Sequence, residues 1–191
     1  MIEHLIVIVG RPGSGKTTAA EGLANQLGCS NFSMGDIIRR SAARSARAET
    51  RYFRPDPYSG EELSAMLVSH LRDVEKTCVV LDGSLMIDEA LEILRKSIPI
   101  GRITSYVLEC DYKTRRARVQ HRGAEGREQE DLEFFEGREG AFDDVLPRTI
   151  EGLRRFGPVI TIDGTASSVA VLETLVRSIR KFSVIENRER E

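Results

Sequence analysis

Residues 10–17 carry the strongest chemical signal in the sequence. They read Gly-Arg-Pro-Gly-Ser-Gly-Lys-Thr and fill every fixed position of the phosphate-binding loop (P-loop) motif G-x-x-x-x-G-K-[ST]. Glycines without a Cβ let backbone N–H groups turn inward around a polyphosphate, at the positive end of the next helix. The Lys16 ammonium would reach the β- and γ-phosphates, and the Thr17 hydroxyl would bind Mg²⁺. The residues expected to bind ATP here are Gly10, Gly13, Ser14, Gly15, Lys16, Thr17 and Thr18.

Asp82 is the best-placed acidic residue for a metal ion. It directly follows the apolar run 77–81, which has the composition of a strand buried on both faces. A carboxylate at the carboxyl end of such a strand faces the same crevice as the P-loop, where it can hold Mg²⁺ together with Thr17. Asp82-Gly83 also suits a simple turn at a strand end. We favour the metal role, because a bound nucleotide needs a cation.

Four arginines follow at spacings that suit phosphate binding. Arg118 and Arg122 are four residues apart and share a helix face, and Arg127 lies in a glycine-flanked loop. Arg138 comes 11 residues after Arg127, which is about three turns if a helix spans them. Guanidinium groups converging from such a segment would neutralise a transferring phosphoryl group. The spacing alone is equally consistent with a solvated basic face.

The elements that must position these residues alternate between strands and helices. This alternation predicts an α/β fold with a parallel sheet covered by helices on both faces. A long helical period over 132–156 contains Pro147, which should kink or restart the helix. Ser59 and Glu62 form a capping box. The expected strands are 5–9, 31–33, 77–81, 103–108 and 159–162, and the other expected helices cover 17–27, 36–48, 63–71, 87–96, 112–121 and 172–179.

Length and composition indicate one domain over residues 1–185, followed by a charged tail at 186–191. The chain has 191 residues, a net charge of −2 and 40% hydrophobic residues, which excludes a disordered protein and a globally basic nucleic-acid binder. Its 28 basic residues are 23 Arg and 5 Lys. The planar Arg fork suits phosphate oxygens, but a compositional bias explains most of this excess.

The cysteines and the apolar runs bear on where the protein works. Cys29, Cys78 and Cys110 are far apart in sequence, so we expect no disulfide or metal framework. We expect buried thiols instead, which fits a reducing compartment. No run approaches the length of a membrane span, and the N-terminus lacks a cationic leader. We therefore expect a soluble cytoplasmic protein, with a monomer favoured.

Several motifs in chain order resemble the adenylate kinase family, of the type with a short lid. They are the P-loop, the segments 33–39, 80–83 and 159–164, and the four arginines, so the resemblance covers nearly the whole chain. It implies a P-loop NTPase three-layer α/β/α fold with a five-stranded parallel sheet. An acceptor-covering helical insertion would lie at about 36–75 and the lid region at 118–138.

The resemblance also implies roles for individual residues. Asp36 and Arg39 belong to the Gly-Asp-x-x-Arg element, in which the Arg grips the phosphate of the acceptor nucleotide. Arg118 would lie near the ATP base. The residues implied to act on the transferring phosphoryl group are Lys16, Arg122, Arg127 and Arg138.

The sequence departs from this family mainly on the acceptor side. Met86 stands where the family places a second phosphate-binding Arg, and Ala90 where a Gln reads adenine. Met34 replaces a common Thr, and Gln129-Glu130 replaces an acidic pair. A methionine cannot replace a bidentate Arg–phosphate contact. We therefore expect a kinase that transfers phosphate from MgATP to a nucleoside monophosphate. An ATPase or nucleotide-dependent interaction protein, and a kinase for another small metabolite, remain as alternatives.

Overall fold

The computed structural model of the chain describes residues 1–43, 59–72, 74–83, 87–122, 135–137 and 139–189. Five parallel strands form one sheet in the order β2-β3-β1-β4-β5, as the alternating pattern predicted. The strands are β1 (Ile2–Gly10), β2 (Ser30–Ser33), β3 (Cys78–Asp82), β4 (Ile100–Glu109) and β5 (Val159–Asp163).

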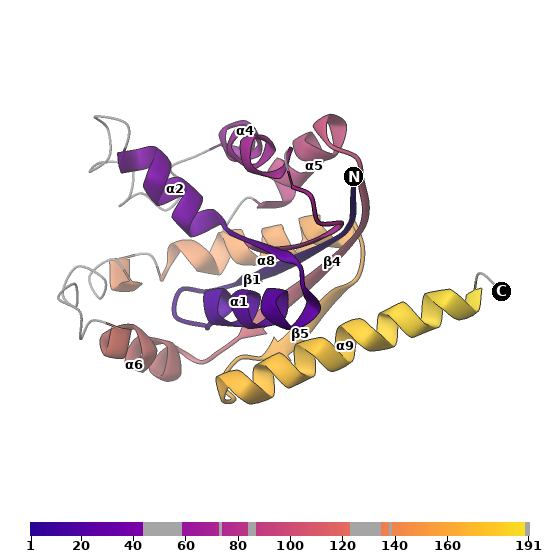
Figure 1. Ribbon diagram of the computed structural model, residues 1–191. Coiled ribbons are helices and arrows are strands. Elements are labelled where there is room, and N and C mark those ends of the chain that lie inside the picture. The colour runs from indigo at the N-terminus through magenta and orange to yellow at the C-terminus, as the bar shows by residue number, and fades with distance from the viewer. Residues whose placement is uncertain (44–58, 73, 84–86, 123–134, 138, 190–191) are drawn as a thin grey trace.

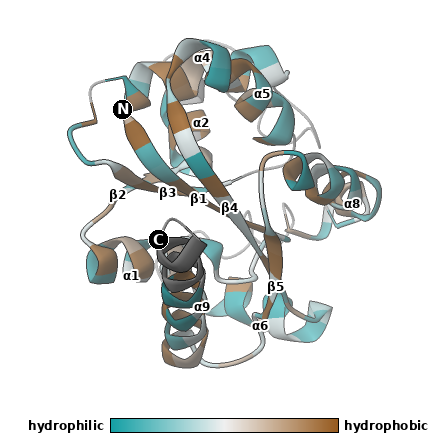
Figure 2. Ribbon diagram, turned by 90° about the vertical axis from the view of Figure 1, so that its right-hand side faces the viewer, coloured by the Kyte–Doolittle hydropathy of each residue, from teal (hydrophilic) through white to brown (hydrophobic). Residues whose placement is uncertain are grey.

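Helices cover both faces of the sheet, which confirms the three-layer α/β/α architecture (Figure 1). Helices α1 and α9 pack on one face, and α4, α5 and α8 on the other (Figure 2). Ser59 and Glu62 form the predicted capping box at the start of α4. The described helices are α1 (Lys16–Leu27), α2 (Met34–Ala43), α4 (Gly60–Leu71), α5 (Ile87–Ser97), α6 (Tyr112–Arg122), α8 (Ala141–Arg154) and α9 (Ser168–Glu189).

The central strand β1 explains why the sequence shows a continuous apolar run. Successive side chains of a strand point to opposite faces of the sheet. Leu5, Val7 and Val9 therefore join the core under α4, α5 and α8, whereas Ile6 and Ile8 join the core under α1 and α9. Burial on both faces anchors the strand whose carboxyl end leads into the P-loop.

Two helices differ from the sequence prediction. Pro147 does not restart a helix, because it lies inside α8, which begins at Ala141. Helix α9 runs on to Glu189, into the segment 186–191 that we assigned to a charged tail. Within the part of the chain that the structure describes, no helix combines the length and apolar character needed to cross a membrane.

The expectation of unpaired cysteines is wrong for two of the three. Cys29 and Cys78 are joined by a disulfide, with their Cα atoms 4.8 Å apart. Cys29 directly precedes β2 and Cys78 is the first residue of the neighbouring strand β3. Ser30 of β2 is in register with Val79 of β3. Parallel pairing thus brings together residues that are 49 positions apart. The cysteine pattern no longer argues for a reducing compartment. Cys110 is a free thiol and is only partly buried.

His70 belongs to a largely apolar helix, but its side chain is not part of the core. It is exposed on α4, where its Nδ1 lies 2.8 Å from the carbonyl oxygen of Met66. Its ring still makes an edge contact with Phe32 at 6.3 Å between centroids.

His4 gives the fold a pH dependence. Burial, and secondarily the nearby Arg102 charge, lower the pKa of His4 from 6.5 to about 4. Its Nε2 is 3.1 Å from the Thr104 hydroxyl. Between pH 6.5 and pH 4, His4 is therefore protonated in the unfolded chain but mostly neutral in the folded chain. Stability is lost as the pH falls from above 6.5 towards 4. We expect the free energy of unfolding to fall by about 1–2 kcal/mol between pH 7.5 and pH 5, allowing for partial exposure.

Urea denaturation at these two pH values measures the effect. The matched variant is His4→Gln, which keeps a polar side chain but cannot take up the proton. Its stability should change less over this range than that of the wild-type protein. Equal losses in the two proteins would show that other groups cause the pH dependence.

Candidate functional site

The P-loop joins β1 to α1 at the carboxyl end of the central strand. Gly15 is the N-cap of α1, with φ of 92°, and no described side chain caps this helix end. The first N–H groups of a helix need partners, and here they are left for an anion. The Ser14 hydroxyl oxygen is buried without a hydrogen-bond partner in the described part of the chain. The loop therefore has the donors and the unsatisfied polar group that a phosphate site requires.

Lys16 lies at the mouth of this loop. Its Nζ donates a hydrogen bond of 3.0 Å to the carbonyl oxygen of Arg11, on the opposite side of the loop. This contact folds the ammonium group back over the loop rather than into solvent. The contact of Lys16 with phosphates stays a prediction.

Asp82 lies beside the P-loop, where the sequence predicted it. Its Oδ2 accepts hydrogen bonds from the Thr17 hydroxyl at 2.6 Å and from the Ser33 hydroxyl at 3.3 Å. The residue is only 5% exposed. One carboxylate and two hydroxyl oxygens from three elements thus converge at one edge of the sheet. Hard oxygen donors are the ligands that Mg²⁺ prefers, so the donor set fits this ion.

Arg118 closes the other side of the P-loop. Its guanidinium group donates to the carbonyl oxygens of Ser14 at 3.3 Å and Gly164 at 2.6 Å. Two more bonds reach Thr165 at 3.3 Å and Ala166 at 3.1 Å. Together these contacts tie α6 to the P-loop and to the turn after β5.

A cavity of about 430 Å³ opens next to this arginine. It begins at the P-loop, so a group attached to a bound phosphate chain would enter it. The cavity is lined by Ser14, Gly15, Thr18, Ala19, Arg118, His121, Gly164, Ala166, Ser168 and Val171.

The turn after β5 is held by a carboxylate. Hydrogen bonds from Thr165 hold the pKa of the Asp163 carboxyl at the end of β5 below its usual value.

The remaining predicted site residues are placed only in part. Asp36 lies in the first turn of α2, and its backbone N–H donates to the Ser33 hydroxyl at 3.4 Å. Arg39 belongs to α2 and Arg122 ends α6, but the side chains of both lie outside the described residues. The predictions for Arg127 and Arg138, and for most of the lid at 118–138, also fall outside the described residues.

Sequence reasoning missed four residues of this region. Ser33 contacts Asp82, and His121 lines the cavity beside Arg118. Arg11 of the P-loop and Arg115 of α6 both bind the carboxylate of Glu139. Arg11 sits inside the motif itself, which was a usable signal. Arg115 had none, because a basic residue on a basic helix gives no sign of burial.

A family model described as an AAA domain matches residues 9–136, which begin at the end of β1 and include the P-loop, Asp82 and the whole of α6.

Curated relatives match over most of the chain. An adenylate kinase from Encephalitozoon cuniculi is 28% identical over 179 residues, covering 91% of this chain and 97% of the relative. An adenylate kinase from Xanthomonas euvesicatoria is 30% identical over 187 residues, covering 91% and 98%. A cytidylate kinase from Desulfurococcus amylolyticus is 31% identical over 140 residues, covering 62% and 75%.

Proposed function

Because the chain belongs to the adenylate kinase family of P-loop proteins, we propose that it transfers the γ-phosphoryl group of MgATP to a nucleoside monophosphate. The observation that carries this proposal is the convergence of three groups at one edge of the sheet. They are the uncapped N-terminus of α1, the Lys16 ammonium and the pair of Thr17 with Asp82. This set suits a triphosphate with its cation better than it suits any other ligand class.

The residues on the donor side have separate roles in this proposal. The loop N–H groups and Lys16 hold the phosphates, and Thr17 and Asp82 would hold Mg²⁺. The ion would supply charge neutralisation between the β- and γ-phosphates. The base of ATP would occupy the cavity beside Arg118. The γ-phosphate would then lie at the mouth of the loop, where the acceptor could reach it.

The transfer itself needs no covalent enzyme intermediate. An oxygen of the acceptor phosphate attacks the γ-phosphorus in line, and the bond to the bridging oxygen of ADP breaks. Charge spreads over the equatorial oxygens, and Arg122, Arg127 and Arg138 are proposed to neutralise it. Asp36 and Arg39 are proposed to hold the acceptor. Exclusion of water then decides between transfer and hydrolysis.

The residues on the acceptor side of the site support two alternative functions. Met34 and Ala90 both have no exposed surface and belong to the same apolar core. Neither side chain carries an amide or hydroxyl group that could read a nucleobase, and both are packed into the core. We therefore propose that the acceptor base is read by other groups than in typical adenylate kinases. The alternatives are a kinase for another small metabolite and an ATPase whose turnover a partner protein controls.

A direct acceptor screen tests the proposal. Purified protein is incubated with MgATP and each of AMP, CMP, GMP, UMP and dTMP, and ADP and acceptor diphosphate are measured together. We expect one acceptor to yield diphosphate in equal amount to ADP, at a rate at least about tenfold above hydrolysis. Chelation of Mg²⁺ should stop both products. ADP formation that no acceptor stimulates would refute nucleoside-monophosphate transfer and favour the ATPase.

A further inference from the structure

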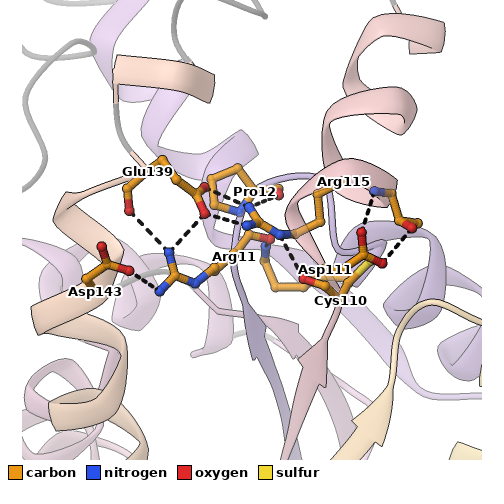
Figure 3. Close-up of polar contacts among 9 residues, drawn as sticks. Arg11, Pro12, Cys110, Asp111, Arg115, Glu139 and Asp143 are labelled. Atoms are coloured by element: carbon orange, nitrogen blue, oxygen red, sulfur yellow. Dashed lines mark hydrogen bonds and ion pairs between the residues drawn. The ribbon is translucent and has the colours of Figure 1, made fainter.

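The carboxylate of Glu139 lies between two guanidinium groups at the P-loop (Figure 3). Arg11 donates to Glu139 Oε1 at 3.0 Å and to its carbonyl oxygen at 3.2 Å. Arg115 donates to Oε2 at 2.7 Å and makes a second bond to Oε1, so this pair is bidentate. Arg11 also pairs with Asp143 of α8. Glu139 thereby joins the P-loop to α6.

Arg115 is a buried charge, and Glu139 is its carboxylate partner. The Arg115 side chain is 3% exposed. Its other polar contacts are with the carbonyl oxygens of Cys110 at 2.9 Å and Pro12 at 3.4 Å. Removing one partner of a buried ion pair leaves an uncompensated charge. The bond from Arg115 accordingly holds the pKa of the Glu139 carboxyl below its usual value.

The same arginine also holds the segment on the other side of residue 138. The Phe135 ring is 99% buried, and its centroid lies 5.4 Å from the Arg115 guanidinium carbon. The Tyr112 ring lies 5.7 Å from the same carbon. Phe135 precedes Arg138 by three residues, and Glu139 follows it directly. Both described flanks of Arg138 are therefore attached to Arg115.

The attachment continues into the backbone of the P-loop. A Cβ at Gly13 would lie 2.7 Å from the carbonyl oxygen of Arg115, so the loop and the first turns of α6 are in direct contact. The P-loop, α6 and the chain at Glu139 are thus linked through one side chain. A displacement at Glu139 would change the distance between its peptide neighbour and the phosphate site.

We propose that Glu139 is a positioning residue: held by Arg11 and Arg115, it fixes the chain that leads to Arg138 against the P-loop during phosphoryl transfer. The inference rests on the proposed function, in which Arg138 stabilises the transferring phosphoryl group. Transfer is sensitive to such placement, since a misplacement of about 1 Å costs on the order of 100-fold in rate. The Glu139 carboxylate is negatively charged and would repel a phosphate, so Glu139 acts through its neighbour in the chain.

The test is Glu139→Gln, assayed with the acceptor that the wild-type protein uses. The amide keeps the shape but loses the charge and the bidentate contact. We expect kcat to fall by at least about tenfold, while the Kd for ATP stays within about threefold. The matched control is Glu136→Gln, because Glu136 joins the same segment to Arg116 of α6 by an exposed pair at 3.1 Å. This control should stay within about twofold in both quantities.

A double variant separates positioning from stability. Glu139→Gln strands the buried charge of Arg115 and so will lower the melting temperature. Arg115→Met with Glu139→Met removes both charges, and apolar replacement of a buried pair often restores stability. We expect the melting temperature to recover while kcat stays low. The proposal is overturned if folded Glu139→Gln keeps kcat within twofold, or if the double variant regains kcat along with its stability.

The wild-type assay distinguishes this proposal from the proposed function. If the wild-type protein transfers phosphate and Glu139→Gln does so equally well, only the positioning role fails. If the wild-type protein hydrolyses ATP without any acceptor, nucleotide transfer fails, and the same variants are compared by their rates of hydrolysis. A tenfold loss there still supports the positioning role, and an unchanged rate overturns it.

Discussion

Lys16→Ala is expected to reduce kcat/KM for phosphoryl transfer by at least about 100- to 1,000-fold, the loss typical of removing one group that stabilises charge in the transition state. The Lys16 ammonium lies across the mouth of the P-loop, bonded to the carbonyl oxygen of Arg11 at 3.0 Å. In the proposed function, Lys16 contacts the phosphates that carry the developing charge. Steady-state kinetics with MgATP and the best acceptor measure the loss.

A second lysine serves as the control for this prediction. Lys76 precedes β3 at the opposite end of the sheet, where its Nζ contacts the carbonyl oxygen of Cys29 at 3.4 Å. Lys76→Ala should leave kcat/KM within about twofold. Circular dichroism should show that Lys16→Ala keeps its fold, because the side chain is partly exposed and outside the core. Turnover near the wild-type level in Lys16→Ala would contradict the proposed site.

Gly13→Ala is expected to weaken ATP binding by at least about tenfold and to lower the free energy of unfolding by about 2–4 kcal/mol. Two causes add here. Gly13 has φ of +76°, which costs an alanine about 1–2 kcal/mol. Its new Cβ would also lie 2.7 Å from the carbonyl oxygen and 3.1 Å from the Cβ of Arg115. The P-loop must therefore move away from α6, and its N–H groups no longer point towards the expected position of the phosphates.

Gly28 separates these two causes. It has a similar φ of +69°, but a Cβ there would meet no atom within 4 Å. Gly28→Ala should therefore lose only the conformational part, about 1–2 kcal/mol, and should bind ATP normally. Calorimetric binding and urea denaturation of both variants test this. Equal effects of the two substitutions on ATP binding would show that contact with Arg115 does not shape the loop.

The local parts of this structure could be predicted because their signals are local. The run at β1 is apolar at every position since both of its faces are buried, and the P-loop motif needs its glycines for backbone reasons. The capping box at Ser59 is likewise a contact between residues three apart. Asp82 was predicted at the right edge because parallel strands end together.

The contacts between distant segments could not be predicted in the same way. The Cys29–Cys78 disulfide depends on the register of β2 against β3, across 49 residues. The exposed position of His70 depends on what α4 packs against. The placement of Pro147 inside α8 depends on tertiary packing that outweighs a local helix penalty.

The sequence by itself determined the layered fold, the phosphate loop and the acid that ends β3. The local pattern of apolar residues and the conformational requirements of the backbone are sufficient to predict those features. Only the tertiary structure decided that Arg115 is buried, that Arg11 shares its carboxylate partner and that Met34 and Ala90 are fully buried. A charged side chain looks the same in sequence whether it faces water or an ion pair. Its desolvation and its partner come from segments that meet only in the folded chain.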